Sequence, residues 1–459
     1  MDAIGSTGGL PFPWLDRPMS PLSCVFGWLL ATALFLTSVG IWHVVGGVIG
    51  DRVEGVAPAV AIEHGALRCA YLPGVRSSVP PLFPLMAAGV MEITRVGANA
   101  TVTSEAGSPC GSVEGKSVVG PESARDLLFI GLFAWPVLLG GFVALLRGAG
   151  RGRCLWEVVG ACLLGCTPAV AATISDYFHP EDLLAMGLIL AALAAAIRSR
   201  WITAGLCIGL AVCAKQYVLL AAIPLVVAAP RPARWRLVSA ALATATVVLV
   251  PLRITMGRGL VDALTGAYAT TTSSGTVVGT LHLHGVALLA ASRLLPLVLA
   301  GALAVWARSR LKTAVCRPEA LVALVATSLA LRLAFETNLF SYYFMATSVS
   351  LIAVDFVVGR LRPGTIGWIV VSSALFPPAF LPPVLVTAAV PQLAQLALAG
   401  SGLFLAAAPL YRAMRAGSDP GRGTRSPDPA GRGTVAAAST TQPGRSTIRV
   451  SQIPDPRAT

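Results

Sequence analysis

Long apolar runs alternate with short polar segments along most of this chain. The runs fall at about 22–45, 126–146, 155–172, 183–197, 201–229, 238–255, 286–307, 319–335, 344–358, 366–380 and 390–411. Apolar runs of about 15 to 25 residues match the hydrocarbon thickness of a bilayer rather than the core of a globular domain. The pattern therefore predicts an all-α polytopic membrane protein, with a transmembrane helical bundle over 22–411.

The run at 201–229 is too long for one span and is interrupted near its middle by Lys215 and Gln216. Basic residues flank this run on both sides. Because loops rich in lysine and arginine stay in the cytoplasm, both ends of the run are expected there. This predicts a hairpin of two short helices whose turn, at 215–217, reaches only the outer half of the bilayer or its outer face.

With the hairpin counted as two helices, the runs predict about twelve spans and two cytoplasmic termini. Residues 1–21 form a short cytoplasmic segment, and 46–125 form a large first extracytoplasmic loop. Within this loop 80–96 is apolar but short, and the charge pattern favours a helix that lies in the interface or re-enters the membrane over a full span. The tail, 412–459, is rich in Pro, Gly, Ser, Thr and Arg without periodicity, which predicts a disordered cytoplasmic segment.

Composition supports a multi-pass protein of the plasma membrane. Of the 459 residues, 55% are hydrophobic and only 12% are charged, whereas soluble domains carry roughly twice that charged fraction. The net charge of +13 comes from bases in short loops rather than from one patch, so no nucleic-acid partner is predicted. The nine cysteines show no metal-ligand spacing, so neither a metal site nor a cofactor is predicted, and metal dependence stays open. Cys69 and Cys110, the two cysteines of the first loop, are free to pair in an oxidising exterior.

The predicted topology gathers the polar chemistry on the outer side of the membrane. Ionisable side chains in or beside a span are costly to keep there, so they are default candidates for a functional site. The acidic segment SDYFHPED precedes one span, and the Lys215 turn reaches the same face. The candidate site residues are Asp51, Asp176, His179, Asp182, Lys215, Gln216, Arg332 and Tyr343.

Three stretches carry a family resemblance. They are DYFHPEDLLAMGLILAALAAAIRSRW with the following AGLCIGLAVCAKQYVLLAAIPLVVAAP, the pair GALRCAYLPG and PPLFPL after an acidic residue, and RLAFE with YYF. In these stretches the chain resembles the actinobacterial C-type membrane glycosyltransferases, a polyprenol-phosphate-sugar-dependent superfamily that includes the glycosyltransferase 87 and DUF2029 mannosyltransferase-like proteins. The resemblance covers about 22–411.

The resemblance implies an enzyme whose active site lies at the outer membrane face. It would transfer a sugar, mannose or a pentose such as arabinose, from a polyprenyl-phosphate donor to a glycan or glycolipid of the cell envelope. The resemblance also implies that Asp51 is the catalytic carboxylate, which takes the proton of the acceptor hydroxyl. Lys215, Arg253 and Arg332 lie at outer ends of spans, where a cation can meet a lipid phosphate.

Each candidate also has a structural interpretation. Asp51 can be a solvated loop carboxylate, with Glu54 as the nearby alternative base, and the acidic residues before the fourth span can be a helix cap and first turn. Lys215 can snorkel to the interface, and Arg332 can pair with Glu336 one turn later. Two further functions remain open: a transporter or flippase for a lipid-linked glycan, and an inactive envelope scaffold.

Overall fold

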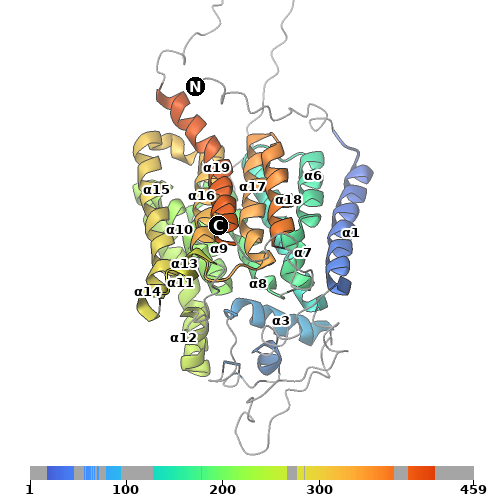
Figure 1. The fold of residues 1–459 in the computed structure, drawn as a ribbon. Coiled ribbons are helices and arrows are strands. Elements are labelled where there is room, and N and C mark those ends of the chain that lie inside the picture. The colour runs from blue at the N-terminus through green and yellow to red at the C-terminus, as the bar shows by residue number, and fades with distance from the viewer. Residues whose placement is uncertain are drawn as a thin grey trace, which may run out of the picture. The chain divides into compact units, whose positions relative to one another are not determined.

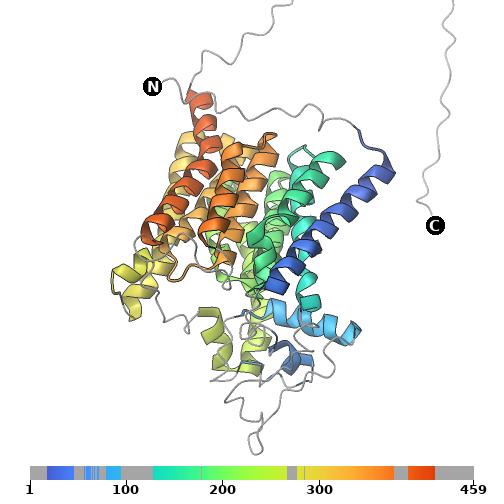
Figure 2. The same ribbon diagram turned by 45° about the vertical axis from the view of Figure 1, so that its right-hand side comes forward.

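The computed structural model describes residues 18–45, 56, 58–63, 65, 67, 70–71, 79–94, 128–176, 178–265, 276–283, 285–376 and 391–418. The chain divides into two units, Met1–Gly417 and Ser418–Thr459. Helices dominate the described residues (Figures 1 and 2), which confirms the all-α prediction. The helices are α1 (Pro21–Val45), α3 (Leu82–Thr94), α5 (Ala134–Gly148), α6 (Cys154–Gly165), α7 (Pro168–Ser175), α8 (Pro180–Ile197), α9 (Trp201–Ala214), η4 (Gln216–Val218), α10 (Leu219–Ala228), α11 (Arg231–Met256), α12 (Arg258–Thr265), α13 (Val277–Thr280), α14 (Gly285–Leu289), η5 (Ala290–Leu294), α15 (Leu295–Leu311), η6 (Lys312–Cys316), α16 (Pro318–Phe335), η7 (Ser341–Phe344), α17 (Met345–Val358), α18 (Pro363–Leu375) and α19 (Pro391–Ser418).

Eight helices in the described residues are long and apolar enough to cross a membrane, which confirms a membrane protein. The number rises to nine if α6 and α7 form one span, because this pair is bent by 57°. Pro168, at the start of α7, cannot donate the backbone hydrogen bond that would continue α6, which accounts for the break. The predicted count of about twelve is not confirmed, since α9, α10 and α18 are apolar but short.

Basic side chains close the helix ends at one end of the bundle, here named the basic end. Arg147 on α5 donates to both carboxylate oxygens of Glu157 on α6, at 2.7 and 3.0 Å. Arg151 donates to the last carbonyls of α17. Arg308 on α15 donates to the last carbonyls of α10, those of residues 227–229. Arg151 and Arg308 thus satisfy carbonyls at helix ends, which have no partner within their own helix.

The interrupted hairpin is present where the pattern predicted it. α9 ends at Ala214, Lys215 is extended (φ −159°, ψ 141°), and η4 and α10 follow. α9 runs parallel to α11, because Gly205 faces Leu237 and Gly209 faces Ala241. α10 must therefore return to the end from which α9 started. At 1.5 Å per residue the 14 residues of α9 rise roughly 21 Å, about two-thirds of a 30 Å hydrocarbon layer.

The opposite end, here named the site end, is covered by part of the predicted first loop. α3 is 13 residues long and runs across this end of the helices (Figure 1). Phe83, Ala87 and Met91 of α3 are buried in one cluster with Ile130 and Phe178. Burial of this face explains why an apolar segment shorter than a span is stable here. Its placement in the membrane interface stays a prediction.

Three predictions fall wholly or partly outside the described residues. Asp51 and Glu54, the first-loop cysteines Cys69 and Cys110, and the tail beyond Ser418 are not described. The last predicted span was expected to end at Tyr411, and α19 continues to Ser418.

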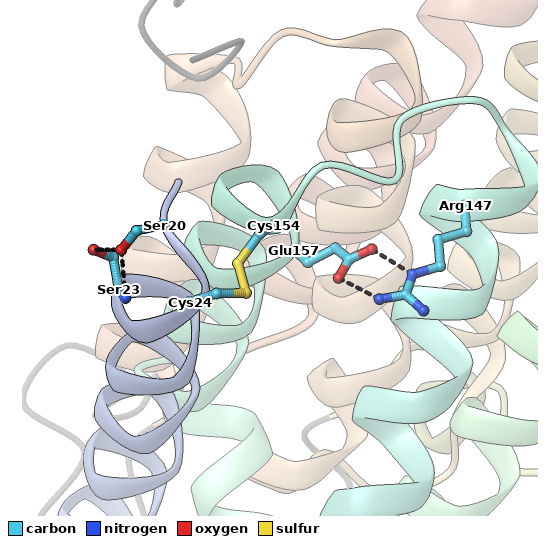
Figure 3. The surroundings of a disulfide bond; sticks show 6 residues. All are labelled: Ser20, Ser23, Cys24, Arg147, Cys154 and Glu157. Carbon is cyan, nitrogen blue, oxygen red and sulfur yellow. Dashed lines mark hydrogen bonds and ion pairs between the residues drawn. A yellow bond between two sulfur atoms is a disulfide. The ribbon is translucent and has the colours of Figure 1, made fainter. Parts of the chain in front are cut away.

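A disulfide joins α1 to α6 at the basic end. Cys24 and Cys154 lie near the starts of the two helices, 130 residues apart in the sequence, with their Cα atoms 6.0 Å apart. Figure 3 shows the bridge beside the Arg147–Glu157 ion pair, so a covalent bond and an ion pair link α1, α6 and α5 in sequence. α1 is otherwise held mainly by apolar contacts with α6 and α7. Sequence analysis singled out Cys69 and Cys110 and did not identify this pair.

We expect peptide mapping of the unreduced protein to recover the segments of Cys24 and Cys154 as one cross-linked species. The bridge closes a loop of more than 100 residues, and such links typically stabilise by roughly 2–4 kcal/mol. Reduction should therefore lower the thermal midpoint. Buried Cys213, a free thiol, is the internal control. Recovery of both Cys24 and Cys154 as free thiols would refute the bridge.

The two ends of the bundle should lie on opposite sides of the membrane. Arg198 is exposed at the basic end, and Leu281 is 59% exposed at the site end. In a background without other cysteines, an impermeant thiol reagent on intact cells should label Leu281→Cys. It should reach Arg198→Cys only after the membrane is opened. The opposite pattern would reverse the orientation predicted from the loop charges.

Candidate functional site

Two carboxylates in the first turn of α8 meet a lysine from the interrupted hairpin. Lys215 Nζ lies 2.8 Å from Glu181 Oε1 and 3.7 Å from Asp182 Oδ2. Pro180 occupies the first helical turn, where its missing N–H removes no helical hydrogen bond. Both carboxylates are buried, and the Lys215 side chain is 12% exposed. The extended backbone of Lys215 directs the chain out of α9 at the level where α8 begins.

His179 binds the same carboxylate oxygen as the lysine. Its Nδ1 lies 2.8 Å from Glu181 Oε1. His179 is the N-cap residue of α8, but its side chain accepts no hydrogen bond from that helix. The ring packs against Tyr342 of η7, with the ring centroids 4.4 Å apart. The imidazole is thus held between a carboxylate and an aromatic ring.

Arg332, near the end of α16, forms the second positive centre. It bonds to Glu336 one turn later. Its guanidinium carbon lies 4.6 Å from the ring centroid of Tyr217 and 5.0 Å from that of Tyr343. Cation–π contacts of this kind contribute about 0.5–2 kcal/mol, more when they are shielded from water. Tyr217 also donates its hydroxyl to the backbone carbonyl of Asp182, at 3.1 Å.

Asp176 lies at the edge of this arrangement. It follows α7 as its C-cap residue and is fully buried. Ser341 Oγ donates to Asp176 Oδ2 at 3.4 Å, so the bond ties the end of α7 to η7. Tyr342 and Tyr343 follow Ser341 directly, and their ring centroids are 4.4 Å apart. η7 therefore contacts both the acidic and the basic groups of the site.

The charged side chains form one cluster, here named the ion-pair network. Its members are His179, Glu181, Asp182, Lys215, Arg332 and Glu336. They come from α8, the α9–η4 break and α16, and the carboxylates are at most 5% exposed. Removing a single partner from a buried ion pair typically costs about 3–5 kcal/mol, because the remaining charge has no counter-charge. The network therefore locks three helix ends to one another.

Tyr71, from the GALRCAYLPG stretch, brings the first loop to the network. Its hydroxyl donates to the carbonyl of Val79 at 2.8 Å. Burial raises the pKa of the Tyr71 phenol, and the negative charge of Glu181 raises this pKa further. Gly259 of α12 lies so close to the Tyr71 carbonyl that a side chain there would collide with it. Tyr71 is therefore a fixed neutral donor close enough to sense the Glu181 charge.

The positive charge between the acidic groups belongs to the protein itself. One ligand-type atom each from His179, Glu181 and Asp182 lies within 4.8 Å of the others. The ammonium group of Lys215 fills this position, hydrogen-bonded to Glu181. A lysine ammonium is a compact cation that donates three hydrogen bonds. The acidic groups of the site are thus already in contact with a cation that the protein itself supplies.

The structure brings most of the predicted site residues together. His179, Asp182, Lys215, Arg332 and Tyr343 belong to the network or contact it directly, Gln216 follows Lys215 in η4, and Asp176 is linked through Ser341. Asp51 lies outside the described residues.

Other details differ from the expectations. Arg253, expected near the phosphate, is exposed in the last turn of α11 and belongs to no ion pair with the described residues of the network. The helix-cap interpretation of the acidic segment holds in part. Glu181 and Asp182 lie in the first turn of α8, as expected, and both also pair with Lys215. Asp176 does not cap α8, because it is the C-cap residue of α7.

Sequence analysis missed two residues of the site and undervalued a third. Glu181 is the centre of the network, since both His179 and Lys215 bond to its Oε1. An acidic residue in the first turn of a helix is also favoured by the helix dipole alone, so the sequence pattern gave no reason to assign Glu181 to a functional site. Tyr217 and Tyr71 carry no charge, and only tertiary packing reveals them. Both residues are identified only in the structure, where their hydroxyl groups lie close to the ion-pair network.

No protein-family model and no curated protein matches this sequence. The family resemblance therefore remains an expectation drawn from the three stretches, and function is argued from the site.

Removing the central ammonium group should destabilise the fold. Lys215→Met leaves the carboxylates of Glu181 and Asp182 without their nearest cation, and we expect the free energy of unfolding to fall by about 3–5 kcal/mol. Lys312→Met, the same change at an exposed lysine of the basic end, should alter it by less than about 0.5 kcal/mol. Denaturation of the detergent-purified proteins measures both values.

The double variant Lys215→Met/Glu181→Gln provides the coupling term. Its destabilisation should be smaller than the sum of the two single changes, because the two groups interact directly. Additive effects would show that the ion pair contributes nothing to stability.

Proposed function

We propose that this protein is a membrane glycosyltransferase. In this proposal it moves a sugar, mannose or a pentose such as arabinose, from a polyprenyl-phosphate donor to a cell-envelope glycan or glycolipid at the extracytoplasmic face. The observation that carries the proposal is the buried ion-pair network at the site end. Ionisable groups at such a depth are expensive to maintain and are therefore expected to serve function.

The depth of the network supports a substrate that is itself anchored in the membrane. Lys215 follows a helix that rises roughly 21 Å from the basic end, so the network lies below the far boundary of a 30 Å hydrocarbon layer. A polyprenyl chain would hold its phosphate and sugar close to this level. A water-soluble donor would have to leave water to reach it.

A small pocket lies beside Asp176, at the edge of the site. It is lined by residues of α7, η7 and α18 with its C-cap, namely Pro168, Ala169, Ala172, Ser341, Phe344, Ser372, Ser373 and Phe376. Ser341 lines this pocket and also bonds to Asp176. A largely apolar surface thus adjoins a buried carboxylate here.

The two cations of the site are only partly available to neutralise a substrate phosphate. Lys215 and Arg332 each have a carboxylate partner inside the protein. Their ammonium and guanidinium groups are thus partly balanced before a substrate arrives. The catalytic role of Asp51 implied by the resemblance remains a prediction, since this residue lies outside the described part of the chain.

A transporter or flippase for a lipid-linked glycan is the second candidate. Its support is the pair of interruptions, at Lys215 between α9 and η4 and between α6 and α7. Transporters commonly bind their cargo at interrupted helices of this kind. Their sites lie near the bilayer midplane, whereas this network lies at the ends of three helices.

One assay separates the two functions. The purified protein is incubated with polyprenyl-phosphate mannose or polyprenyl-phosphate arabinose and with a panel of envelope glycolipid acceptors. We expect a glycosylated product and release of polyprenyl phosphate in equal amounts. Movement of a fluorescent lipid-linked glycan across proteoliposomes, without formation of product, would replace this proposal by the flippase function.

A further inference from the structure

The backbone before α8 is held in a strained conformation. Phe178 has a φ of +51°, in the left-handed region that a bulky residue seldom occupies and that costs about 1–3 kcal/mol. Its ring is fully buried and packs edge-on against Phe83, with centroids 6.0 Å apart. Burial of the Phe178 ring therefore fixes the backbone turn that precedes His179. Strain of this kind gathers at functional sites.

The histidine that this turn presents is not used to stabilise the helix. Its side chain caps no backbone group of α8, although it stands at the N-cap. Nδ1 bonds to Glu181, and Nε2 has no hydrogen-bond partner among the residues that the structure describes. The side chain is 13% exposed, so Nε2 remains accessible.

Glu181 determines which ring nitrogen carries the proton. Its Oε1 already accepts a hydrogen bond from the Lys215 ammonium at 2.8 Å. A carboxylate oxygen can only accept, so Nδ1 must donate its hydrogen to the same atom. A neutral His179 therefore has its lone pair on Nε2, the accessible nitrogen.

The acidic groups of the network outnumber its permanent cations. The network contains three carboxyl groups, those of Glu181, Asp182 and Glu336, and two permanent cations, Lys215 and Arg332. His179 Nδ1 and Lys215 Nζ each lie 2.8 Å from the same oxygen, Glu181 Oε1.

We propose that His179 is the proton acceptor of the transfer reaction, with Glu181 as its positioning residue. This inference rests on the proposed function. The acceptor hydroxyl oxygen forms a bond to the anomeric carbon while the bond from that carbon to the phosphate oxygen breaks. The polyprenyl phosphate leaves with the electron pair, and the hydroxyl proton moves to Nε2. His179 later releases this proton to water.

Several charged and titratable groups lie on the elements that meet around His179. They are Glu181 and Asp182 on α8, Lys215 at the hairpin break, Arg332 and Glu336 at the end of α16, Tyr342 and Tyr343 on η7, Asp176 after α7, and Tyr71 from the first loop. Of these, the phenol ring of Tyr342 packs directly against the imidazole.

The first test reads the ring directly and needs no substrate. The chain has five histidines, so nitrogen-15 labelling of histidine gives few signals, and His179→Gln identifies the one of interest by its loss. We expect the neutral ring to carry its proton on Nδ1, the less common tautomer in free histidine, and to convert to imidazolium on acidification. A neutral ring protonated on Nε2 would overturn the proposal.

The second test is the pH profile of sugar transfer. Protonation of the base should give the wild type an acidic limb in kcat/KM, and His179→Gln should lose this limb together with about 100-fold to 10,000-fold of the rate. Added imidazole should restore part of the activity to His179→Ala. His282→Gln, at an exposed histidine of the site end, is the matched control and should behave as wild type.

The same assay compares His179 with the base that the family resemblance implies. Asp51→Asn should keep the acidic limb if His179 takes the proton. Loss of the limb in Asp51→Asn but not in His179→Gln would assign the base to Asp51 and overturn this proposal. A wild type without an acidic limb would also overturn it, whether or not the variants fold. An inactive wild type that shows the expected tautomer would refute the glycosyltransferase function and leave the His179–Glu181 pair established.

Discussion

The burial of Glu181 against Lys215 is the constraint on which the site depends. A carboxylate that is fully buried requires a cation, and the cation comes from a residue 34 positions later in the chain. Lys215 can supply it only because α9 stops at Ala214 and the backbone becomes extended. A continuous helix would carry the side chain past the first turn of α8. The interrupted hairpin is therefore a requirement of the ion pair, and the orientation of His179 follows from both.

Charge is used differently at the two ends of the bundle. Arginines of the basic end donate to helix carbonyls, as Arg308 does to residues 227–229. These arginines therefore have a structural role that does not depend on membrane topology. Their presence at the basic end is for this reason weaker evidence that this end lies in the cytoplasm. The Cys24–Cys154 bridge lies at this same end, and disulfides persist mainly in oxidising compartments. Loop charge and the disulfide thus point to opposite compartments, and direct labelling of the two ends discriminates between them.

The sequence allowed prediction of the helical class, the interrupted hairpin and most members of the site, because apolar length and isolated charges are one-dimensional signals. Lys215 was identifiable since a lysine inside an apolar run has few structural reasons to be there. The partner of Lys215 was not, because Glu181 and Asp182 are equally acidic neighbours in one helical turn. The bend between α6 and α7 and the pairing of Cys24 with Cys154 depend on how distant helices pack. Neither leaves a periodic trace in the sequence.

The depth of the network also limits the chemistry that it can perform. Both cations of this buried cluster already have a carboxylate partner, so a soluble phosphate compound would gain little by entering it. A lipid-anchored donor is different, because its chain, rather than its charge, determines its position in the membrane. In the proposed transfer, the proton of the acceptor hydroxyl moves to His179 while negative charge develops on the departing phosphate. The new positive charge on the imidazole then forms at the same time as the negative charge, and the two attract each other.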